Sequence, residues 1–136
     1  MLRHHASDAS FGAQVAALCE KGGLTLAVAG DVGLARAIGA AMVHNPTGDA
    51  AGLLVSRSVH SRKEAIAARG ADLIFVSPLH ASASHQGAEP LGFDGALALA
   101  RVSGVPAIAL GGMDPARGRR AMAAGFYGWA AIDAWR

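Results

Sequence analysis

The sequence predicts an α/β protein in which helices alternate with the strands of a parallel sheet. Short apolar runs of four to six residues recur along the chain, as is typical of strands buried on both faces. Helical patterns lie between most of them, and several begin at Ser or Asp and end at Gly, residues that favour helix termini. The predicted strands are 24–29, 41–45, 53–56, 72–77, 105–110 and 127–132, with a seventh candidate at 1–4.

The predicted helices complete the alternation. They cover 8–23, 31–40, 61–71, 93–104 and 114–125. The later units repeat every ~25–30 residues, which suits a (β/α)₈ barrel or a flavodoxin-like open sheet equally. A complete barrel usually needs about 200 residues or more, and this chain has 136. We expect one domain, and the periodicity leaves both architectures open.

Composition narrows the class of protein. The chain is 52% hydrophobic, much of it alanine, with a net charge of only +2 and dispersed basic residues, so we expect no nucleic-acid partner. No apolar run reaches the ~20 residues of a membrane span, and the N-terminus lacks the order of a signal peptide. We therefore expect a cytoplasmic protein that binds no membrane. The single Cys19 is expected in the core.

Polar residues gather where the predicted strands end, which is where α/β folds bind ligands. Asp31 and Asp49 follow consecutive strands and could share Mg²⁺, a hard ion that prefers carboxylates and substrate phosphates. The alternative is a helix N-cap for Asp31 and a solvated loop carboxylate for Asp49. Gly111 and Gly112 could approach an anion at the start of a helix, or could simply form a tight turn.

Two further features stand out near the strand ends. We expect His44 and His60 to be packed or hydrogen-bonded rather than catalytic, and no pair of histidines has the spacing of a helical zinc site. The segment SPLHASASHQGAEPLG (77–92) is long for a connection in a compact domain, where about 4–6 residues are usual. Such length points to a functional loop.

Taken in order, these strand ends resemble the thiamine phosphate synthase family, which includes thiazole tautomerases. The segment SVHSRKEA (58–65) matches the family's Ser-Val-His-Ser followed by a helix with Glu, and Val43-His44 precedes Asp49 at the family's spacing. The loop SPLHASASHQGAEPLG is similar to the family's Gly-Pro-Val-Phe-x-Thr-x-Thr-Lys loop, and Gly111-Gly112-Met113 matches its Gly-Gly turn.

The resemblance implies a TIM (β/α)₈ barrel, here a single incomplete barrel domain over 1–136 that lacks the first βα unit and the last helix. It implies a Mg²⁺-dependent transferase that joins hydroxymethylpyrimidine diphosphate to thiazole phosphate and releases pyrophosphate. By resemblance, Asp31 and Asp49 hold Mg²⁺, and Arg3, Ser58 and His85 are catalytic. The implied substrate-binding residues are Arg3, His5, Ser58, Ser82, Ser84, His85, Gly111, Gly112, Ile132 and Asp133.

The sequence departs from the family pattern at charged positions. His5 and His85 stand where the family has lysines, Gly30 replaces an Asn beside the metal, and Asp133 replaces a Ser near the thiazole phosphate. Pro78 stands where the tautomerases carry a catalytic His, which argues against tautomerase activity. An incomplete barrel also exposes strand edges, so we expect a homo-oligomer as one way to cover them.

Two other functions remain open on the sequence. A non-catalytic or regulatory paralogue would keep the pocket for thiazole phosphate or thiamine phosphate without turnover. A different phosphate-binding α/β enzyme, such as a phosphosugar isomerase or epimerase, is supported only by the Gly-Gly turn and the fold.

Overall fold

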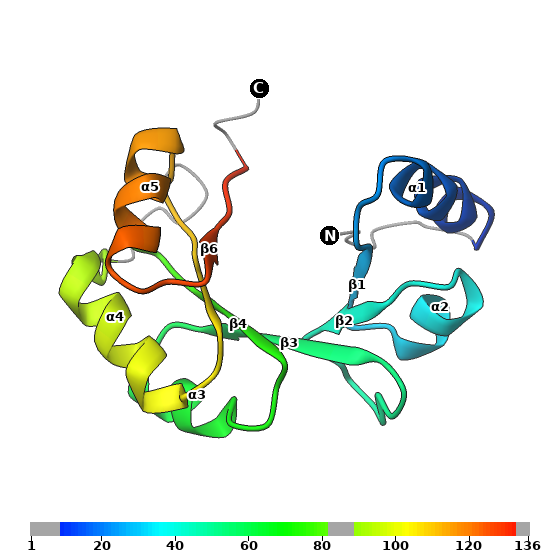
Figure 1. Cartoon of the computed structure of the whole chain (residues 1–136). Helices are drawn as coiled ribbons and strands as arrows, with labels where there is room; N and C mark the ends of the chain where they lie inside the picture. Colours follow the sequence, from blue (N-terminus) through cyan, green and yellow to red (C-terminus); the bar gives the residue numbers. More distant parts are fainter. Residues whose placement is uncertain (1–8, 82–88, 133–136) are drawn as a thin grey trace. The chain divides into compact units, whose positions relative to one another are not determined.

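Six parallel strands form one sheet in the computed structural model of the chain, which describes residues 9–81 and 89–132 (Figure 1). Each strand lies beside the next one in the sequence, in the order β1-β2-β3-β4-β5-β6. A doubly wound sheet would reverse its strand order at a switch point, whereas a barrel adds its strands in sequence. The order therefore decides between the two architectures in favour of a TIM-barrel-like α/β fold.

The elements alternate as predicted. The strands are β1 Ala27–Ala29, β2 Met42–His44, β3 Leu54–Val59, β4 Leu73–Val76, β5 Ala107–Ala109 and β6 Gly128–Trp129. The helices are α1 Ala9–Lys21, α2 Val32–Ala37, α3 Arg62–Ala67, α4 Gly92–Ser103 and α5 Pro115–Ala123. The candidate strand at 1–4 lies outside the described residues.

The chain divides into two compact units, Met1–Ser56 and Arg57–Arg136, with the boundary inside β3. In the first unit, α1 and α2 (blue to cyan in Figure 1) pack with β1 and β2. Its buried core consists of Leu26, Val28, Ala35, Ile38 and Ala40. Leu26 and Val28 come from the apolar run 24–29, Ala35 comes from α2, and Ile38 and Ala40 come from the segment between α2 and β2.

The second unit has the larger core. Val59, Ile74, Val76 and Leu79 are fully buried in it, and α4 packs against both α3 and β4. Helix α5 lies against β6, where the Trp129 ring occupies the space that a side chain at position 118 would need. A Cβ atom on Gly118 would lie 2.4 Å from that ring, so glycine is required for this close packing.

Three of the described helix starts follow the sequence signals. Asp31, Ser61 and Asp114 each accept a hydrogen bond from a backbone N–H in the first turn of α2, α3 and α5. Helix α4 instead begins after Leu91, which offers no side-chain hydrogen bond. It ends as predicted, at Gly104 with a φ of 68°.

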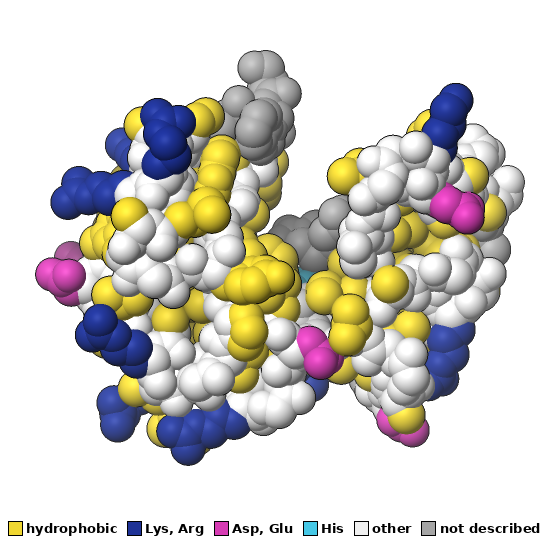
Figure 2. Space-filling view, viewed as in Figure 1, with side chains coloured by type: hydrophobic (Ala, Val, Ile, Leu, Met, Phe, Trp, Pro, Cys, Tyr) yellow, Lys and Arg dark blue, Asp and Glu magenta, His cyan; other side chains and the backbone are white. Residues whose placement is uncertain are grey.

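Figure 2 shows the side chains on one face of the molecule. Lys and Arg side chains stand in several separate groups rather than in one continuous stripe. Within the described residues, no helix combines the length and the apolar character needed to cross a membrane.

Candidate functional site

In the first unit, the loops that follow β1 and β2 are hydrogen-bonded to each other. The N–H and the hydroxyl of Thr47 both donate to the carbonyl oxygen of Gly30, each over 3.1 Å. The Gly30 N–H in turn donates to the His44 carbonyl, with 2.8 Å between nitrogen and oxygen. These bonds tie the loop that contains Asp49 to the turn that contains Asp31.

Both aspartates use one carboxylate oxygen locally. Asp31 Oδ1 accepts from the Leu34 N–H over 2.8 Å, and Asp49 Oδ1 accepts from the Ala51 N–H over 2.9 Å. Both residues are exposed. Asp31 is therefore the N-cap that the sequence allowed, and this role leaves its second oxygen available for a ligand.

The donor set suits Mg²⁺. Two carboxylates on connected loops are the kind of partial site that this ion completes with water and substrate phosphates. Among the described residues, no group of three or more His, Cys, Asp or Glu side chains could hold a metal ion by itself. The metal assignment of Asp31 and Asp49 stays a prediction, as does that of Mg²⁺.

A buried polar network lies beside these loops. His44 is 6% exposed, with Nδ1 3.0 Å from Ser56 Oγ and Nε2 3.3 Å from the side-chain nitrogen of Asn45. Both ring nitrogens of His44 therefore lie within hydrogen-bond distance of a polar side chain. Asn45 has a φ of 48°, which Asn tolerates better than most residues. His44 is thus hydrogen-bonded and packed, as expected.

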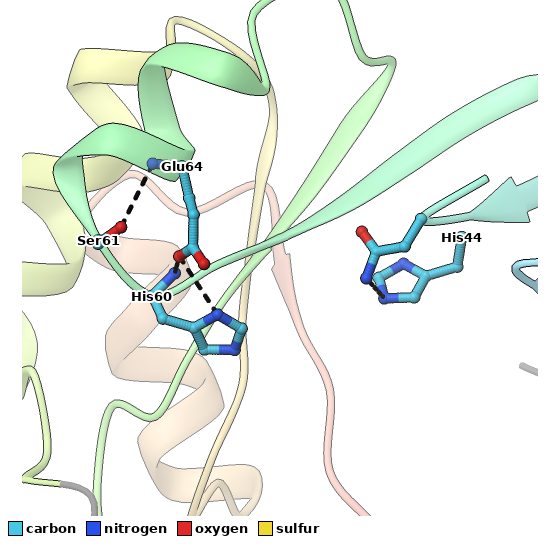
Figure 3. Close-up of polar contacts among 5 residues, drawn as sticks. His44, His60, Ser61 and Glu64 are labelled. Atoms are coloured by element: carbon cyan, nitrogen blue, oxygen red, sulfur yellow. Dashed lines mark hydrogen bonds and ion pairs between the residues drawn. The ribbon is translucent and has the colours of Figure 1, made fainter. Parts of the chain in front are cut away.

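In the second unit, His60 and Glu64 form an exposed pair at the start of α3 (Figure 3). His60 Nδ1 lies 3.3 Å from Glu64 Oε2, which also accepts from the His60 N–H over 2.6 Å. Burial acts to raise the pKa of Glu64, but the hydrogen bonds and the nearby His60 ring outweigh it and lower the pKa. This pair stabilises the helix start, so His60 is hydrogen-bonded, as expected.

The Gly111-Gly112 turn follows β5 and packs against the segment 77–81. Leu79 N–H donates to Leu110 O over 3.0 Å, and His80 N–H donates to Gly111 O over 3.1 Å. A Cβ atom on Gly111 would lie 2.7 Å from Pro78 Cα, and one on Gly112 would lie 2.7 Å from the Ala81 carbonyl oxygen. The φ values of these residues are 96° and 61°, a conformation that favours glycine. Both positions therefore require glycine for two reasons, the backbone conformation and the lack of space for a Cβ atom.

The same turn faces the start of α5. Arg117 Nη1 donates to the Gly112 carbonyl, and Arg117 Nε lies 3.5 Å from Asp114 Oδ2. The Arg117 N–H also donates to Asp114 Oδ1 over 2.8 Å, and this bond is the main reason why the pKa of Asp114 is lowered. Within the described part of the chain, the N–H groups of Gly111 and Gly112 donate to no other residue. They could therefore receive an anion.

His80 lies next to this turn with its Nε2 buried and without a hydrogen-bond partner among the described residues. Its ring centroid is 6.5 Å from that of Phe93, whose ring also lies 5.4 Å from the guanidinium carbon of Arg120. Burial is the first cause of the lowered pKa of His80, and Arg117 adds to it, while Asp114 acts in the opposite direction. The imidazole is thus held in an environment that disfavours its charged form.

The remaining predicted site residues divide into two sets. Ser58 lies inside β3, half-buried, rather than in the loop after it, because β3 extends to Val59. Ile132 follows β6 and is 53% exposed. Arg3, His5, Ser82, Ser84, His85 and Asp133 lie outside the described residues.

Sequence reasoning missed the residues that hold these loops in place. The Asp114–Arg117 pair had a local signal, since residues three apart meet on a helix. Arg36 donates from α2 to the carbonyl oxygens of Asp49 and Ala51. These residues are 13 and 15 positions away, and no local sequence pattern predicts such a contact. Thr47 gave no signal either, because its partner Gly30 lies 17 positions away.

Comparisons with known proteins identify the family through a family model and support the fold through solved structures. The family model described as thiamine monophosphate synthase matches residues 4–135. A solved structure of thiamine phosphate pyrophosphorylase from Pyrococcus furiosus is similar with a TM-score of 0.78 and 22% identity, covering 96% of this chain and 69% of that one. A structure titled "Native KDPGal structure" has a TM-score of 0.62 and 18% identity, covering 96% and 79%. No curated protein matches the sequence.

The two structural likenesses support the barrel-like fold and, at such low identity, nothing more. The family model covers nearly the whole chain and agrees with the resemblance of the strand-end motifs. The chain belongs to the thiamine monophosphate synthase family.

Proposed function

We propose that the protein is a thiamine phosphate synthase. It would couple hydroxymethylpyrimidine diphosphate to thiazole phosphate, with thiamine phosphate and pyrophosphate as products. The observation that carries this proposal is the family match over residues 4–135. A cytoplasmic location and small phosphorylated substrates are part of the proposal.

The reaction exchanges one bond for another. The bond from the pyrimidine methylene carbon to the pyrophosphate oxygen breaks, and the electron pair leaves with pyrophosphate. The thiazole nitrogen then donates its own pair to that carbon, so no proton is transferred. The barrier lies mainly in the developing negative charge of the leaving group, and preorganised donors near it are the main catalytic requirement.

Two aspartates would meet this requirement, and a glycine turn would bind the other substrate. Asp31 and Asp49 would hold Mg²⁺, which supplies positive charge for pyrophosphate oxygens when bound. The N–H groups of Gly111 and Gly112 would bind the thiazole phosphate at the start of α5, where the helix favours negative charge. Arg117 would stabilise that turn through the Gly112 carbonyl.

Five further residues would act as the resemblance to the family implies. Ser58 would contact the substrates from β3, and Arg3, Ser82, Ser84 and His85 would serve as the resemblance implies. With His85 in place of a lysine, the charge at the pyrophosphate would depend on protonation, because a free histidine has a pKa of about 6.5.

The direct test is to incubate the purified protein with both substrates and Mg²⁺ and to measure thiamine phosphate by chromatography. Product is expected with the native chain, and an Asp49→Asn variant should give at least about 10-fold less. Calorimetry with thiazole phosphate runs in parallel. Tight binding without product would identify the regulatory alternative, and neither binding nor product would refute the proposal.

A further inference from the structure

Arg36 is the only arginine among the described residues of the first unit, and it binds backbone carbonyls rather than a carboxylate. Its Nη2 donates to Ala51 O over 2.8 Å and lies 3.4 Å from Asp49 O. It comes from α2, the helix that Asp31 caps. One side chain therefore connects that helix to the loop that contains Asp49.

The loop is closed on its other side by Asp49 itself. Asp49 Oδ1 accepts from the Ala51 N–H over 2.9 Å, so the carboxylate is held by the residue whose carbonyl Arg36 binds. Without the hydrogen bonds from Arg36, Ala51 could change its orientation. The hydrogen bond from the Ala51 N–H that orients the Asp49 carboxylate would then be lost. The aspartate's direction thus depends on a residue that does not touch its side chain.

The charges suit this role. Arg36 forms no ion pair with Asp49 in the described part of the chain, so its guanidinium does not compete with a cation for that carboxylate. Both carbonyl contacts come from Nη2, which carries two N–H groups and lies at the end of a planar, rigid guanidinium. Outer residues of this kind are known to control metal affinity through the ligands that they orient.

We propose that Arg36 is a positioning residue for Asp49, acting through the carbonyl oxygens of Asp49 and Ala51 to preorganise the carboxylate for a divalent cation. The proposal rests on the proposed function for the identity of that cation. Thr47, which fixes the same loop to Gly30, gives the arrangement its second support.

The test compares Arg36→Met, which keeps the length of the side chain but removes its donors, with Arg36→Lys. Arg69→Met is the matched control, because Arg69 also binds a backbone carbonyl, that of Val102, over 2.9 Å, but in the other unit. The first readout is hydrogen exchange of the Ala51 amide without metal. We expect exchange to be about 10-fold faster in Arg36→Met and unchanged in Arg69→Met.

The second readout is titration with Mg²⁺ in the presence of pyrophosphate by calorimetry. We expect affinity about 10-fold lower in Arg36→Met, an intermediate value in Arg36→Lys, and no change in Arg69→Met. Saturating Mg²⁺ should restore the turnover of Arg36→Met, because only the affinity for the ion is reduced. If the substitution unfolded the loop, excess Mg²⁺ would not restore turnover. Native exchange at Ala51 in Arg36→Met would overturn the inference, as would a native Mg²⁺ titration.

The proposed function and the positioning role of Arg36 can be refuted independently of each other. If the native protein itself binds no Mg²⁺ with pyrophosphate, the metal role in the proposed function is refuted. Faster exchange of Ala51 in Arg36→Met would then still show that Arg36 positions the Asp49 loop.

Discussion

At the scale of single residues, Asp31 has one role that its contacts define and a second that we propose. Its Oδ1 caps α2 through the Leu34 N–H, and its other oxygen would bind Mg²⁺. These two roles need different properties of the side chain. The cap needs an oxygen acceptor, which Asn also provides, whereas the cation needs negative charge.

Two substitutions at this position should therefore separate the roles. Asp31→Asn should keep the free energy of unfolding near that of the native protein, because Asn and Asp are about equally good caps. Asp31→Ala should lower it by about 1 kcal/mol. Both should reduce turnover at least about 10-fold at limiting Mg²⁺. Urea unfolding and the synthase assay check this, and native turnover in Asp31→Asn would leave Asp31 as a cap only.

His80 makes the second prediction at this scale, on pH dependence. Its pKa is lowered in the folded protein, so the unfolded chain takes up a proton more readily. The contribution to stability is complete above the unfolded pKa of about 6.5 and is lost as pH falls below that value. His80→Phe keeps an aromatic ring beside Phe93 and cannot titrate.

We therefore expect the native protein to lose more stability than His80→Phe between pH 7.5 and pH 5.5. Unfolding in urea at both pH values measures the difference, and comparing the two proteins cancels the effect of the other histidines. Equal losses in the two proteins would show that His80 is not protonated on unfolding in this range.

At the scale of elements, the strand ends show what could be predicted from sequence. The caps at Asp31, Ser61 and Asp114 were predictable because a cap depends on residues two or three positions away. The lengths of the strands were less predictable. The apolar runs 24–29 and 127–132 give only the short strands β1 and β6, whereas β3 extends beyond its apolar run 53–56 to Val59.

The turn after β5 shows the same limit. Two consecutive glycines suggested either a turn or a ligand cradle, and nothing local indicated that the segment 77–81 would pack directly on them. Such packing joins positions more than 30 apart, and only the fold reveals it. The turn requires glycine for the chain's own packing, and its role in binding phosphate is part of the proposed function.

Substitution of these glycines gives the prediction at this scale. Gly112 and Gly104 have similar φ values, 61° and 68°, but only Gly112 has neighbours in the way, with His80 Cβ 2.8 Å from an added Cβ. Gly104→Ala should therefore cost about 1 kcal/mol of unfolding free energy, from backbone strain alone. Gly112→Ala should cost about 2–4 kcal/mol, because overpacking adds to that strain.

Urea unfolding of both variants measures the difference, and thiazole phosphate binding by calorimetry follows it. Loss of affinity in Gly112→Ala but not in Gly104→Ala is expected if the turn binds the phosphate. Equal unfolding free energies for the two variants would contradict the close packing of the turn on segment 77–81.

At the scale of the whole molecule, each unit has its own buried core. The cluster around Val28 and Ala35 lies within 1–56, and the cluster around Ile74 and Val76 lies within 57–136. The described residues of the two clusters do not overlap. Cooperative unfolding follows contiguous cores, so we expect the two units to open with different free energies.

Two truncations of buried side chains test this expectation. Val43→Ala removes fully buried methyl groups from the first unit, and Ile74→Ala does the same in the second. Both tryptophans lie within 57–136, so their fluorescence reports the second unit, while circular dichroism reports both. Losses of about 1–3 kcal/mol for Val43→Ala and 2–5 kcal/mol for Ile74→Ala are expected.

The two probes should then disagree in a defined way. Val43→Ala should shift the transition seen by circular dichroism to lower urea and leave the fluorescence transition in place, because the buried side chain that is shortened lies within 1–56. Ile74→Ala should shift the fluorescence transition. If Val43→Ala moved both transitions equally, the sheet would be unfolding as one cooperative body through β3, and the separate cores would have no separate stability.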